Sequence, residues 1–332
     1  MTNTRLPSAG MESGGAYNRH ATLQAIGRAE PLRLFESAAL HAQLGDRGEP
    51  IVIVDYGSSQ GKNSLAPMRA GIDALCARTG SDRLIIVYHE DLPVNDFNAL
   101  FTVLAKDPES YLRSRPNVFA SAIARSFYEP VLPANSVHLG WSSYAAMWFS
   151  RIPSTIPDHF APEAAQGEVR AAFDAQGAAD WERFLLLRAE ELRSGGRLVV
   201  AVPGSDENGA SGLVRIRSDA NATIAQMVND GLIEAEERAQ MVLGAIPRRR
   251  SELLAPFAHG AGFHGLEAEH CETYCVDDLA WREYQQGGSA EALAAKRAAF
   301  VRVTYGPTLA SVLAPEKRRG FLDVLEAGVK RR

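Results

Sequence analysis

A short glycine turn and the two acids near it are the residues of this chain best suited to chemistry. Asp55 ends the apolar run Ile51–Val54, the turn Gly57–Gly61 follows it, and Asp91 stands after a second apolar run. Small residues let the backbone approach a ligand closely. An acid at a strand end can receive an ammonium group, and an acid after the next strand can accept hydrogen bonds from two ribose hydroxyls. The pattern is therefore typical of a site for an adenosyl cofactor.

Other interpretations of the same turn stay open. Gly61-Lys62 resembles the end of a phosphate-binding loop, but three residues separate the glycines instead of four, and Asn63 stands where Ser or Thr is needed. Residues 57–61 spell the nucleophile elbow G-x-S-x-G around Ser59, but no HGGG-type stretch supplies an oxyanion loop. The dinucleotide spacing G-x-G-x-x-G is absent. An ordinary tight turn with Asp55 as a helix cap would need no ligand at all.

The elements that must position these residues alternate between apolar runs and helical patterns. Continuous apolar runs are typical of strands buried on both faces, as in a parallel sheet covered by helices. We expect strands at residues 51–55, 83–88, 118–124, 136–141 and 197–202. Helices are expected at 18–44, interrupted at Pro31, at 65–78, and at 180–193, closed by Gly195-Gly196. The fold class is therefore α/β, a doubly wound, Rossmann-like sheet.

The pattern becomes helical and loop-rich after Gly204. Amphipathic segments at 223–231 and 234–243 predict helices, and the run Phe300–Thr304 predicts a late strand that returns to the sheet. We therefore expect an inserted helical cap over the active site. The division would be 1–48 for an N-terminal lid and helix, 49–204 for a cofactor-binding core, 205–290 for the cap, and 291–332 for a C-terminal return to the core.

Composition narrows the class of protein. The 332 residues carry 35 basic and 40 acidic side chains, a formal net charge of −5. That balance disfavours nucleic acid or an anionic membrane as the main partner, because both need clustered positive charge. No apolar run reaches the ~18–20 residues of a membrane span, and the first 15 residues lack the apolar core of a signal peptide. Three cysteines make a disulfide framework an unlikely design, so we expect a cytoplasmic protein.

Four segments carry motifs that occur together in one known family. They are Gly14–Gln24, with its opening glycines and Tyr17; Asp55–Leu65, the turn with Asn63; Glu90–Asn98, which reads EDLPVNDFN; and Ser126–Trp148, where SFY is followed by SSYAAMW. In order and spacing they resemble the SABATH carboxyl methyltransferases, which use S-adenosylmethionine. The similarity is specific over residues 14–153 and loose beyond Gly204.

The resemblance implies roles for particular residues. The cofactor site would comprise Tyr17, Asp55, Gly57, Asn63, Asp91, Leu92, Ser126 and Phe127. The acceptor carboxylate would be held by the catalytic residues Gln24 and Trp148, with Tyr144 and Met147 lining the pocket.

The resemblance also implies an activity. The protein would methylate a small carboxylic acid, aromatic or medium-chain, and release a methyl ester and S-adenosylhomocysteine. It would be a homodimer and a bacterial-looking member of the family. This chain departs from the family at His20-Ala21, where Asn-Ser is usual, and at Ser13, where a Lys is expected. The metal site of some members has no match, so no metal is expected.

The chemistry needs few catalytic groups. A carboxylic acid with a pKa near 4 is ionised at neutral pH, so its oxygen is a ready nucleophile and no general base is required. The site must hold that oxygen ~3 Å from the methyl carbon, in line with the departing sulfur. The amide of Gln24 and the indole N–H of Trp148 can donate hydrogen bonds to both carboxylate oxygens. Methylation of an amine or phenol, or a non-catalytic binder of the cofactor or acid, are the alternatives.

Several further residues could be taken for ligand sites. His270, Cys271 and Cys275 suggest zinc only weakly, because Cys-x3-Cys lacks a second pair, and we expect the two cysteines on a buried strand or helix face. The runs Arg248–Arg250 and Lys330–Arg332 are expected on solvated faces. Arg215 and Arg217 are expected at the surface, and would otherwise meet a polar or second acidic group of the substrate.

Overall fold

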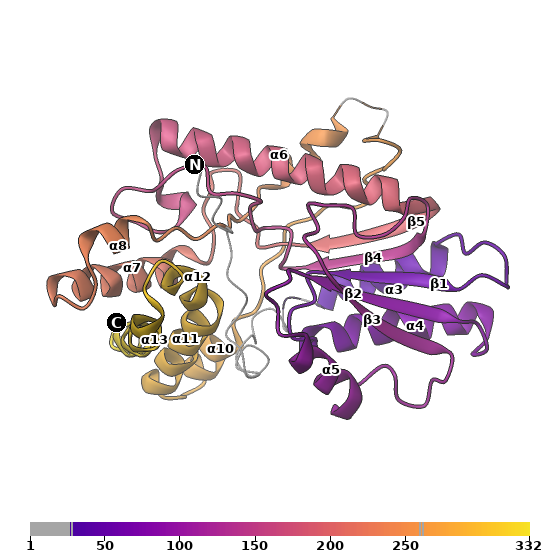
Figure 1. Cartoon of the computed structure of the whole chain (residues 1–332), viewed down its shortest axis with the longest axis horizontal. Helices are drawn as coiled ribbons and strands as arrows, with labels where there is room; N and C mark the ends of the chain where they lie inside the picture. The colour runs from indigo at the N-terminus through magenta and orange to yellow at the C-terminus, as the bar shows by residue number, and fades with distance from the viewer. Residues whose placement is uncertain (1–26, 28, 259, 261) are drawn as a thin grey trace.

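A parallel sheet forms the centre of one half of the molecule, shown in a computed structural model that describes residues 27, 29–258, 260 and 262–332 (Figure 1). Within this part of the chain the sheet has five strands in the order β3-β2-β1-β4-β5. Their bounds are β1 Ile51–Tyr56, β2 Ile85–Asp91, β3 Val118–Ala124, β4 Val137–Ser143 and β5 Leu192–Ala201. Every neighbouring pair is parallel.

The strands form where continuous apolar runs can be buried on both faces. Ile51, Ile53 and Val54 of β1 are fully buried, and β1 pairs with β2 and β4 through Ile51↔Ile85 and Ile53↔Leu139. Because all strands run in one direction, their carboxyl ends meet at one edge of the sheet. This edge is where a doubly wound sheet binds ligands.

Helices cover both faces of the sheet, so the expectation of a doubly wound α/β fold is confirmed. On one face pack α3 (Ala29–His41), α4 (Leu65–Thr79) and α5 (Phe97–Lys106), whose apolar side chains share a buried cluster with β1, β2 and β4. On the other face lies α6 (Gly167–Glu191), which contributes Trp181, Phe184 and Leu185 to a second cluster. Figure 1 shows α6 running along the top of the view, from the sheet towards the C-terminal helices.

A buried ion pair holds the end of α6 against the sheet. Arg188 and Glu191 are almost fully buried, with Nη2 of Arg188 2.8 Å from Oε1 of Glu191. The hydroxyl of Tyr56 on β1 donates to Glu191, and the Arg188 guanidinium lies 4.3 Å from the centre of the Tyr56 ring. The pair therefore joins α6 to the central strand.

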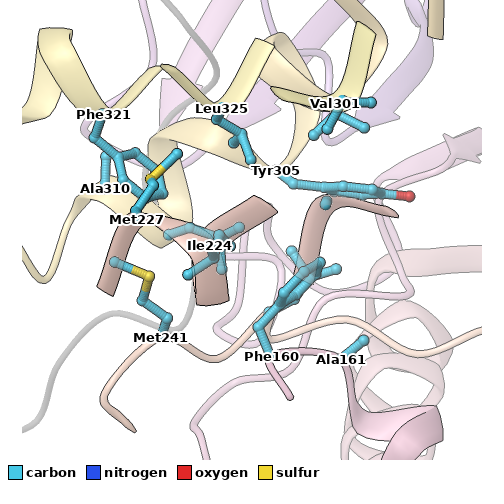
Figure 2. Packing of buried hydrophobic residues seen from close by; sticks show 14 of the residues in the cluster. Phe160, Ala161, Ile224, Met227, Met241, Val301, Tyr305, Ala310, Phe321 and Leu325 are labelled. Atoms are coloured by element: carbon cyan, nitrogen blue, oxygen red, sulfur yellow. The ribbon is translucent and has the colours of Figure 1, made fainter. Parts of the chain in front are cut away.

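The remaining helices build a cap beside the sheet. They are α7 (Val214–Asn229), α8 (Ala235–Ala239), α9 (Arg250–Leu254), α10 (Leu279–Gln285), α11 (Ala290–Thr304), α12 (Gly306–Ala310) and α13 (Pro315–Lys330), with single turns η1 (Lys62–Ser64), η2 (Pro162–Ala164) and η3 (Ala255–Phe257). Figure 2 shows the buried cluster in which Ile224 and Met227 of α7 meet Tyr305 and the C-terminal helices. A helical cap is therefore present, but the expected return of residues 291–332 to the core was wrong, because α11–α13 pack in the cap against α7.

One expected strand is a helix. The run Phe300–Thr304 was expected to return to the sheet, but it forms the last turns of α11. Its apolar residues occur in an alanine-rich segment whose start is capped by Ser289, which accepts a hydrogen bond from the Ala292 N–H. The helix buries Phe300 and Val301 against the cap. Tertiary packing and capping thus outweigh the local β-branched composition.

Other expected boundaries were also wrong. The helix α6 begins at Gly167 and ends at Glu191, so Gly195-Gly196 lie inside β5 and do not close the helix. The helix expected at 234–243 is limited to Ala235–Ala239. The helix expected at 18–44 is described from Ala29 to His41, with Pro31 in its first turn, where its missing N–H costs no helical hydrogen bond. Residues 18–26 and 28 lie outside the described part.

We expect the Phe35→Ala substitution to lower the free energy of unfolding by about 3–5 kcal/mol, because a fully buried ring leaves a cavity. The Phe35 ring packs edge-on at 5.1 Å against Trp141 of β4. The matched control in the same helix is Leu40→Ala, since Leu40 is 47% exposed. Chemical denaturation of both variants tests this, and equal losses would show that Phe35 does not anchor α3.

Candidate active site

The candidate site lies at the carboxyl edge of the sheet, where the ends of β1 to β4 converge. Asp55 is the fifth residue of β1, Asp91 ends β2, Ser126 and Phe127 follow β3, and Tyr144 follows β4. The structure therefore brings together the described residues that the sequence assigned to the cofactor and acceptor. Tyr17 and Gln24 lie outside the described residues.

The glycine turn after β1 is shaped by close backbone packing. Gly57 has φ of 84°, and a Cβ there would lie 2.1 Å from the Cβ of Ala145. Its N–H and that of Ser58 both donate to the backbone oxygen of Glu90, each at 2.9 Å. Any other residue would be strained at this φ, and its Cβ would clash with Ala145. Glycine is therefore required here. The turn is thereby fixed to the end of β2.

Asp91 is bound from two sides by backbone N–H groups. Its Oδ2 accepts from Ser59 N at 2.7 Å, and its Oδ1 accepts from Leu92 N at 2.8 Å. Asn95 completes the link by donating from its amide to the Ser59 carbonyl at 2.8 Å. Burial raises the pKa of Asp91 to about 6, and the two backbone N–H groups oppose this rise. Each oxygen keeps a second lone pair that can accept from a ligand hydroxyl.

Asp55 takes part in a buried hydrogen-bonded chain. Its Oδ2 lies 3.1 Å from Nδ1 of His89, and Nε2 of His89 lies 2.7 Å from the Tyr111 hydroxyl. Burial raises the pKa of Tyr111, so the phenol stays protonated and can donate to the ring nitrogen. With Nδ1 then carrying the proton, His89 donates to Asp55. This chain of hydrogen bonds fixes the orientation of the Asp55 carboxylate at the strand end. No motif in the sequence singled out Tyr111.

Several polar atoms around the turn are buried and unsatisfied. The hydroxyl oxygens of Ser58 and Ser59 and Oε1 of Glu90 have no hydrogen-bond partner among the described residues. Burial raises the pKa of Glu90 well above its usual value, with Asp91 adding to the effect. Unsatisfied buried polar atoms are rare in native proteins and often mark a ligand site. These atoms, with the close backbone approach at Gly57, fit the polar and charged groups of an adenosyl cofactor.

The segment after β3 supplies an aromatic wall. The Phe127 ring packs against Tyr128 at 4.7 Å and against Phe184 of α6 at 5.7 Å. The Phe127 carbonyl accepts from Nη1 of Arg188 at 2.9 Å, and Ser126 accepts from the Tyr128 N–H through its hydroxyl. A Cβ at Gly57 would lie 3.9 Å from the Phe127 ring, so this ring borders the glycine turn. Asn63 lies in η1, which directly follows that turn in the sequence.

The residues expected to hold the acceptor follow β4. Tyr144 has φ of 59°, and its N–H donates to the Ala201 carbonyl at 2.7 Å. Met147 is buried in the cap cluster, whereas Trp148 is partly buried and packs against the same cluster. The Trp148 backbone pairs with Ala245, and its carbonyl accepts from the Tyr128 hydroxyl at 2.5 Å. Trp148 is thus held from both the β3 side and the cap side.

Gly27 lies between Tyr144 and the segment that carries Tyr274. Its carbonyl accepts from the Tyr274 hydroxyl at 2.7 Å. A Cβ at Gly27 would lie 2.2 Å from the Tyr144 hydroxyl and 3.2 Å from Val276. The absence of a side chain at Gly27 therefore lets the backbone pass close to both Tyr144 and Val276.

Two arginine expectations and one cysteine expectation need correction. Arg217 is buried, paired with Glu163, and lies over the Tyr305 ring, whereas Arg215 is exposed as expected. Arg248 is also buried, unlike Arg250 of the same run. Both buried guanidinium groups have polar or aromatic partners that lie far away in the sequence.

The two cysteines lie on an irregular segment. Cys271 is half-buried and Cys275 is exposed, so neither sits on a buried strand or helix face. In the described ranges no group of three or more His, Cys, Asp or Glu side chains gathers in a way that could hold a metal ion. Nor does any helix there combine the length and the apolar character needed to cross a membrane.

Comparison with known proteins identifies the family. Residues 6–325 match the family described as SAM dependent carboxyl methyltransferase. The chain belongs to this family. Methyltransferase FUS9 of Gibberella moniliformis is 33% identical over 201 residues, which cover 60% of this chain and 53% of that protein. Gibberellic acid methyltransferase 2 of Arabidopsis thaliana is 27% identical over 278 residues, covering 76% and 71%.

The chain spans about half the length of the fungal relative it matches. The relatives named here come from a fungus and a plant, so they do not support the expectation of a bacterial-looking member. A solved structure, "Loganic acid methyltransferase with SAH", has a TM-score of 0.77 and 20% identity, and the match covers 97% of this chain and 92% of that one. The likeness shows that this carboxyl methyltransferase chain shares that fold.

We expect binding of S-adenosylhomocysteine to weaken about tenfold between pH 7.5 and pH 5, one unit below the raised pKa of Asp91. The ionised carboxylate accepts hydrogen bonds from ligand hydroxyls, and a proton removes that capacity, so affinity is lost as the pH falls through about 6. Asp91→Ala should weaken binding at pH 7.5 by about 1.5–3 kcal/mol and flatten the profile.

Calorimetric titration across this pH range makes the measurement. Asp73→Asn is the control, because Asp73 pairs with Arg115 on the surface and should keep the original profile. An unchanged profile in Asp91→Ala would place the titrating group elsewhere.

Proposed function

We propose that this protein transfers a methyl group from S-adenosylmethionine to the carboxylate of a small carboxylic acid, aromatic or medium-chain. The products would be a methyl ester and S-adenosylhomocysteine. Membership of the carboxyl methyltransferase family supports the reaction class. The observation that carries the proposal is the contact between the glycine turn and the segment that carries Trp148: Gly57 packs on Ala145, three residues before Trp148.

The chain's own residues would hold the cofactor through complementary charge and shape. Asp55, oriented by His89, would receive the ammonium group, and Asp91 would accept from the two ribose hydroxyls. Leu92 and Phe127 offer apolar surface beside these acids. Asn63 and Ser126 add polar groups from the two flanking turns, and Tyr17 is proposed to close the site from the N-terminal side. When bound, the cofactor supplies a methyl group on a sulfonium that needs no further activation.

The acceptor side would act by positioning. A carboxylate is already ionised at neutral pH, so the protein has no proton to remove. The Trp148 indole N–H makes no hydrogen bond to any described residue and could donate to one carboxylate oxygen, with the Gln24 amide donating to the other. Neutral donors orient the nucleophile without the strong ground-state stabilisation that a salt bridge would give. Tyr144 and Met147 would form the wall beside the acid.

We further propose that the enzyme is a cytoplasmic homodimer. The helix α10 exposes Leu279, Trp281 and Tyr284, and the two aromatic rings lie 5.4 Å apart. Exposed apolar side chains of this kind are typical of a contact surface. The free thiols of Cys76, Cys271 and Cys275 suit a reducing compartment. Sedimentation equilibrium should give twice the mass of one chain, and a monomer at micromolar concentration would contradict the dimer.

A panel of acids tests the activity. With labelled S-adenosylmethionine, we expect mass spectrometry to find a methyl ester of at least one acid. Trp148→Phe should lower kcat/KM about ten- to a hundredfold, the scale of a lost hydrogen bond to a charged group, and leave binding of S-adenosylhomocysteine unchanged. Trp281→Phe is the control, because Trp281 is 43% exposed and lies on α10.

Two outcomes would contradict the proposal. Folded protein that binds S-adenosylhomocysteine and forms no ester from any acid would refute the reaction. Transfer to amines or phenols only would establish the alternative acceptor class.

A further inference from the structure

A cavity of about 570 Å³ lies along the outer edge of β5. Its walls come from β5, from α3 and α6 on the two faces of the sheet, and from the segment 265–276. The volume is within the range of ~300–1,000 Å³ that is common for small-molecule sites. Tyr144 and Arg248 both line it, so the cavity reaches the acceptor end of the sheet.

Arg248, one of the residues that line this cavity, has an incompletely paired guanidinium. The residue is 3% exposed, and its Nη1 donates to the Gly177 carbonyl of α6 at 2.7 Å. Its Nε and Nη2 have no hydrogen-bond partner in the described part of the chain. The backbone is fixed beside the end of β5, because its N–H donates to Pro203 and its carbonyl accepts from Ser205. The guanidinium is therefore held in place with two donor nitrogens unused.

The acids that act electrostatically on Arg248 are engaged with other groups. Asp180 of α6 accepts from the Ser150 N–H and hydroxyl and from Gln176. Glu252 of α9 accepts from the backbone N–H of Arg249. Neither acid forms an ion pair with Arg248 among the described residues, and burial lowers the pKa of Arg248. A buried charge without an ion-pair partner is costly, so an anion at this place would be strongly stabilised.

Of the three acids that line the cavity on the segment 265–276, two are also paired. Glu269 forms an ion pair with Arg197 of β5, and Glu272 lies 3.6 Å from His270. These pairs line the cavity along the segment 265–276. Because Arg197 already has a carboxylate partner, Arg248 is the better place in this cavity for a ligand anion.

Arg248 is connected to the proposed transfer site through a short segment. Ala245, three residues before Arg248, pairs with Trp148, and the Ile246 N–H donates to the Met147 carbonyl. Tyr128, whose hydroxyl binds the Trp148 carbonyl, is also among the groups that act electrostatically on Arg248. One acid molecule could therefore reach from Trp148 towards Arg248.

We propose that the acceptor carries a second anionic group and that Arg248 binds it, so that the substrates are dicarboxylic acids or similarly charged acids. This inference rests on the proposed methyl transfer. Arg248 suits the second group and not the reacting one, because a salt bridge would lower the nucleophilicity of the carboxylate to be methylated. Trp181, Leu253 and Phe257 in the cavity wall would contact the apolar body of the acid.

The reaction balances in atoms and charge. One carboxylate oxygen of the dianion forms a bond to the methyl carbon, the bond from that carbon to sulfur breaks, and its electron pair stays on sulfur. The sulfonium becomes a neutral thioether, and the dianion becomes a monoanionic monomethyl ester. The second carboxylate remains paired with Arg248 throughout. Its charge would keep the distal end in place while the reacting end becomes neutral.

The test compares linear dicarboxylic acids of four to ten carbons with monocarboxylic acids of the same length. For the full-length protein, we expect kcat/KM for the preferred dicarboxylic acid to exceed that of its monocarboxylic counterpart about ten- to a hundredfold, the scale of one charge-assisted pair. Arg248→Met should remove this preference mainly through KM, and leave turnover of the monocarboxylic acid and binding of S-adenosylhomocysteine within twofold. Arg248→Lys should retain part of the preference.

Controls separate this role from a structural one. Arg250→Met removes the same charge two residues away, at an exposed position, and should keep the dicarboxylic preference. If Arg248→Met does not fold, the Arg248→Lys variant and the comparison of the two acid series with the wild-type protein still test the inference. Equal kcat/KM for the two acid series, or an equal loss for both in Arg248→Met, would overturn the inference while leaving methyl transfer intact. No ester from any acid would instead refute the proposed function.

Discussion

The buried pair of Arg188 and Glu191 is the interaction on which the site depends. Two charges taken out of water must satisfy each other and find further hydrogen-bond partners. Here the partners lie on two other parts of the chain: Tyr56 is on β1, and the Phe127 carbonyl and the Val131 N–H are in the segment between β3 and β4. The end of α6, the central strand and the aromatic wall are therefore fixed relative to one another. A displacement of any of them would leave a charge unpaired in the core.

The parallel sheet then determines where polar groups can gather. Its interior strands bury apolar side chains on both faces, so acids are accommodated only near the strand ends, where turns offer backbone N–H groups. Asp91 illustrates this, because the Ser59 and Leu92 N–H groups both bind it. The Ser59 N–H, together with the N–H groups of Gly57 and Ser58 that bind the Glu90 carbonyl, holds the glycine turn against β2. The end of β2, the glycine turn and the position of the Asp91 carboxylate thus depend on the same hydrogen bonds. Together they form the ligand-binding edge of the sheet.

The sequence predicted those features that depend on neighbouring residues. Continuous apolar runs gave the five strands, and Asp55 and Asp91 were found because each stands at the end of such a run. The structure confirmed β3 with its expected bounds. The run Phe300–Thr304 was misassigned, because β-branched residues favour a strand locally while the cap favours a helix. Local patterns do not contain that information.

Residues paired over long sequence distances could not be predicted. Arginine is usually exposed, so Arg217 and Arg248 were expected in solvent. Their burial depends on Glu163 and on the Gly177 carbonyl, 54 and 71 residues away. The role of Tyr111 also depends on a contact between elements, its hydrogen bond with His89. In each case the signal was a contact between elements, which a single sequence does not show.

The bond between Tyr274 and Gly27 has a consequence for the order of assembly. It joins residues 247 positions apart, and it meets the acceptor wall at Tyr144. During synthesis, the strands β1 to β4 and the glycine turn can emerge and pair long before residue 274 leaves the ribosome. Closing so long a loop is entropically costly until the intervening elements have packed. The contact of Tyr274 with Gly27 beside Tyr144 is therefore made late, and a nascent chain holds a formed glycine turn before this contact exists.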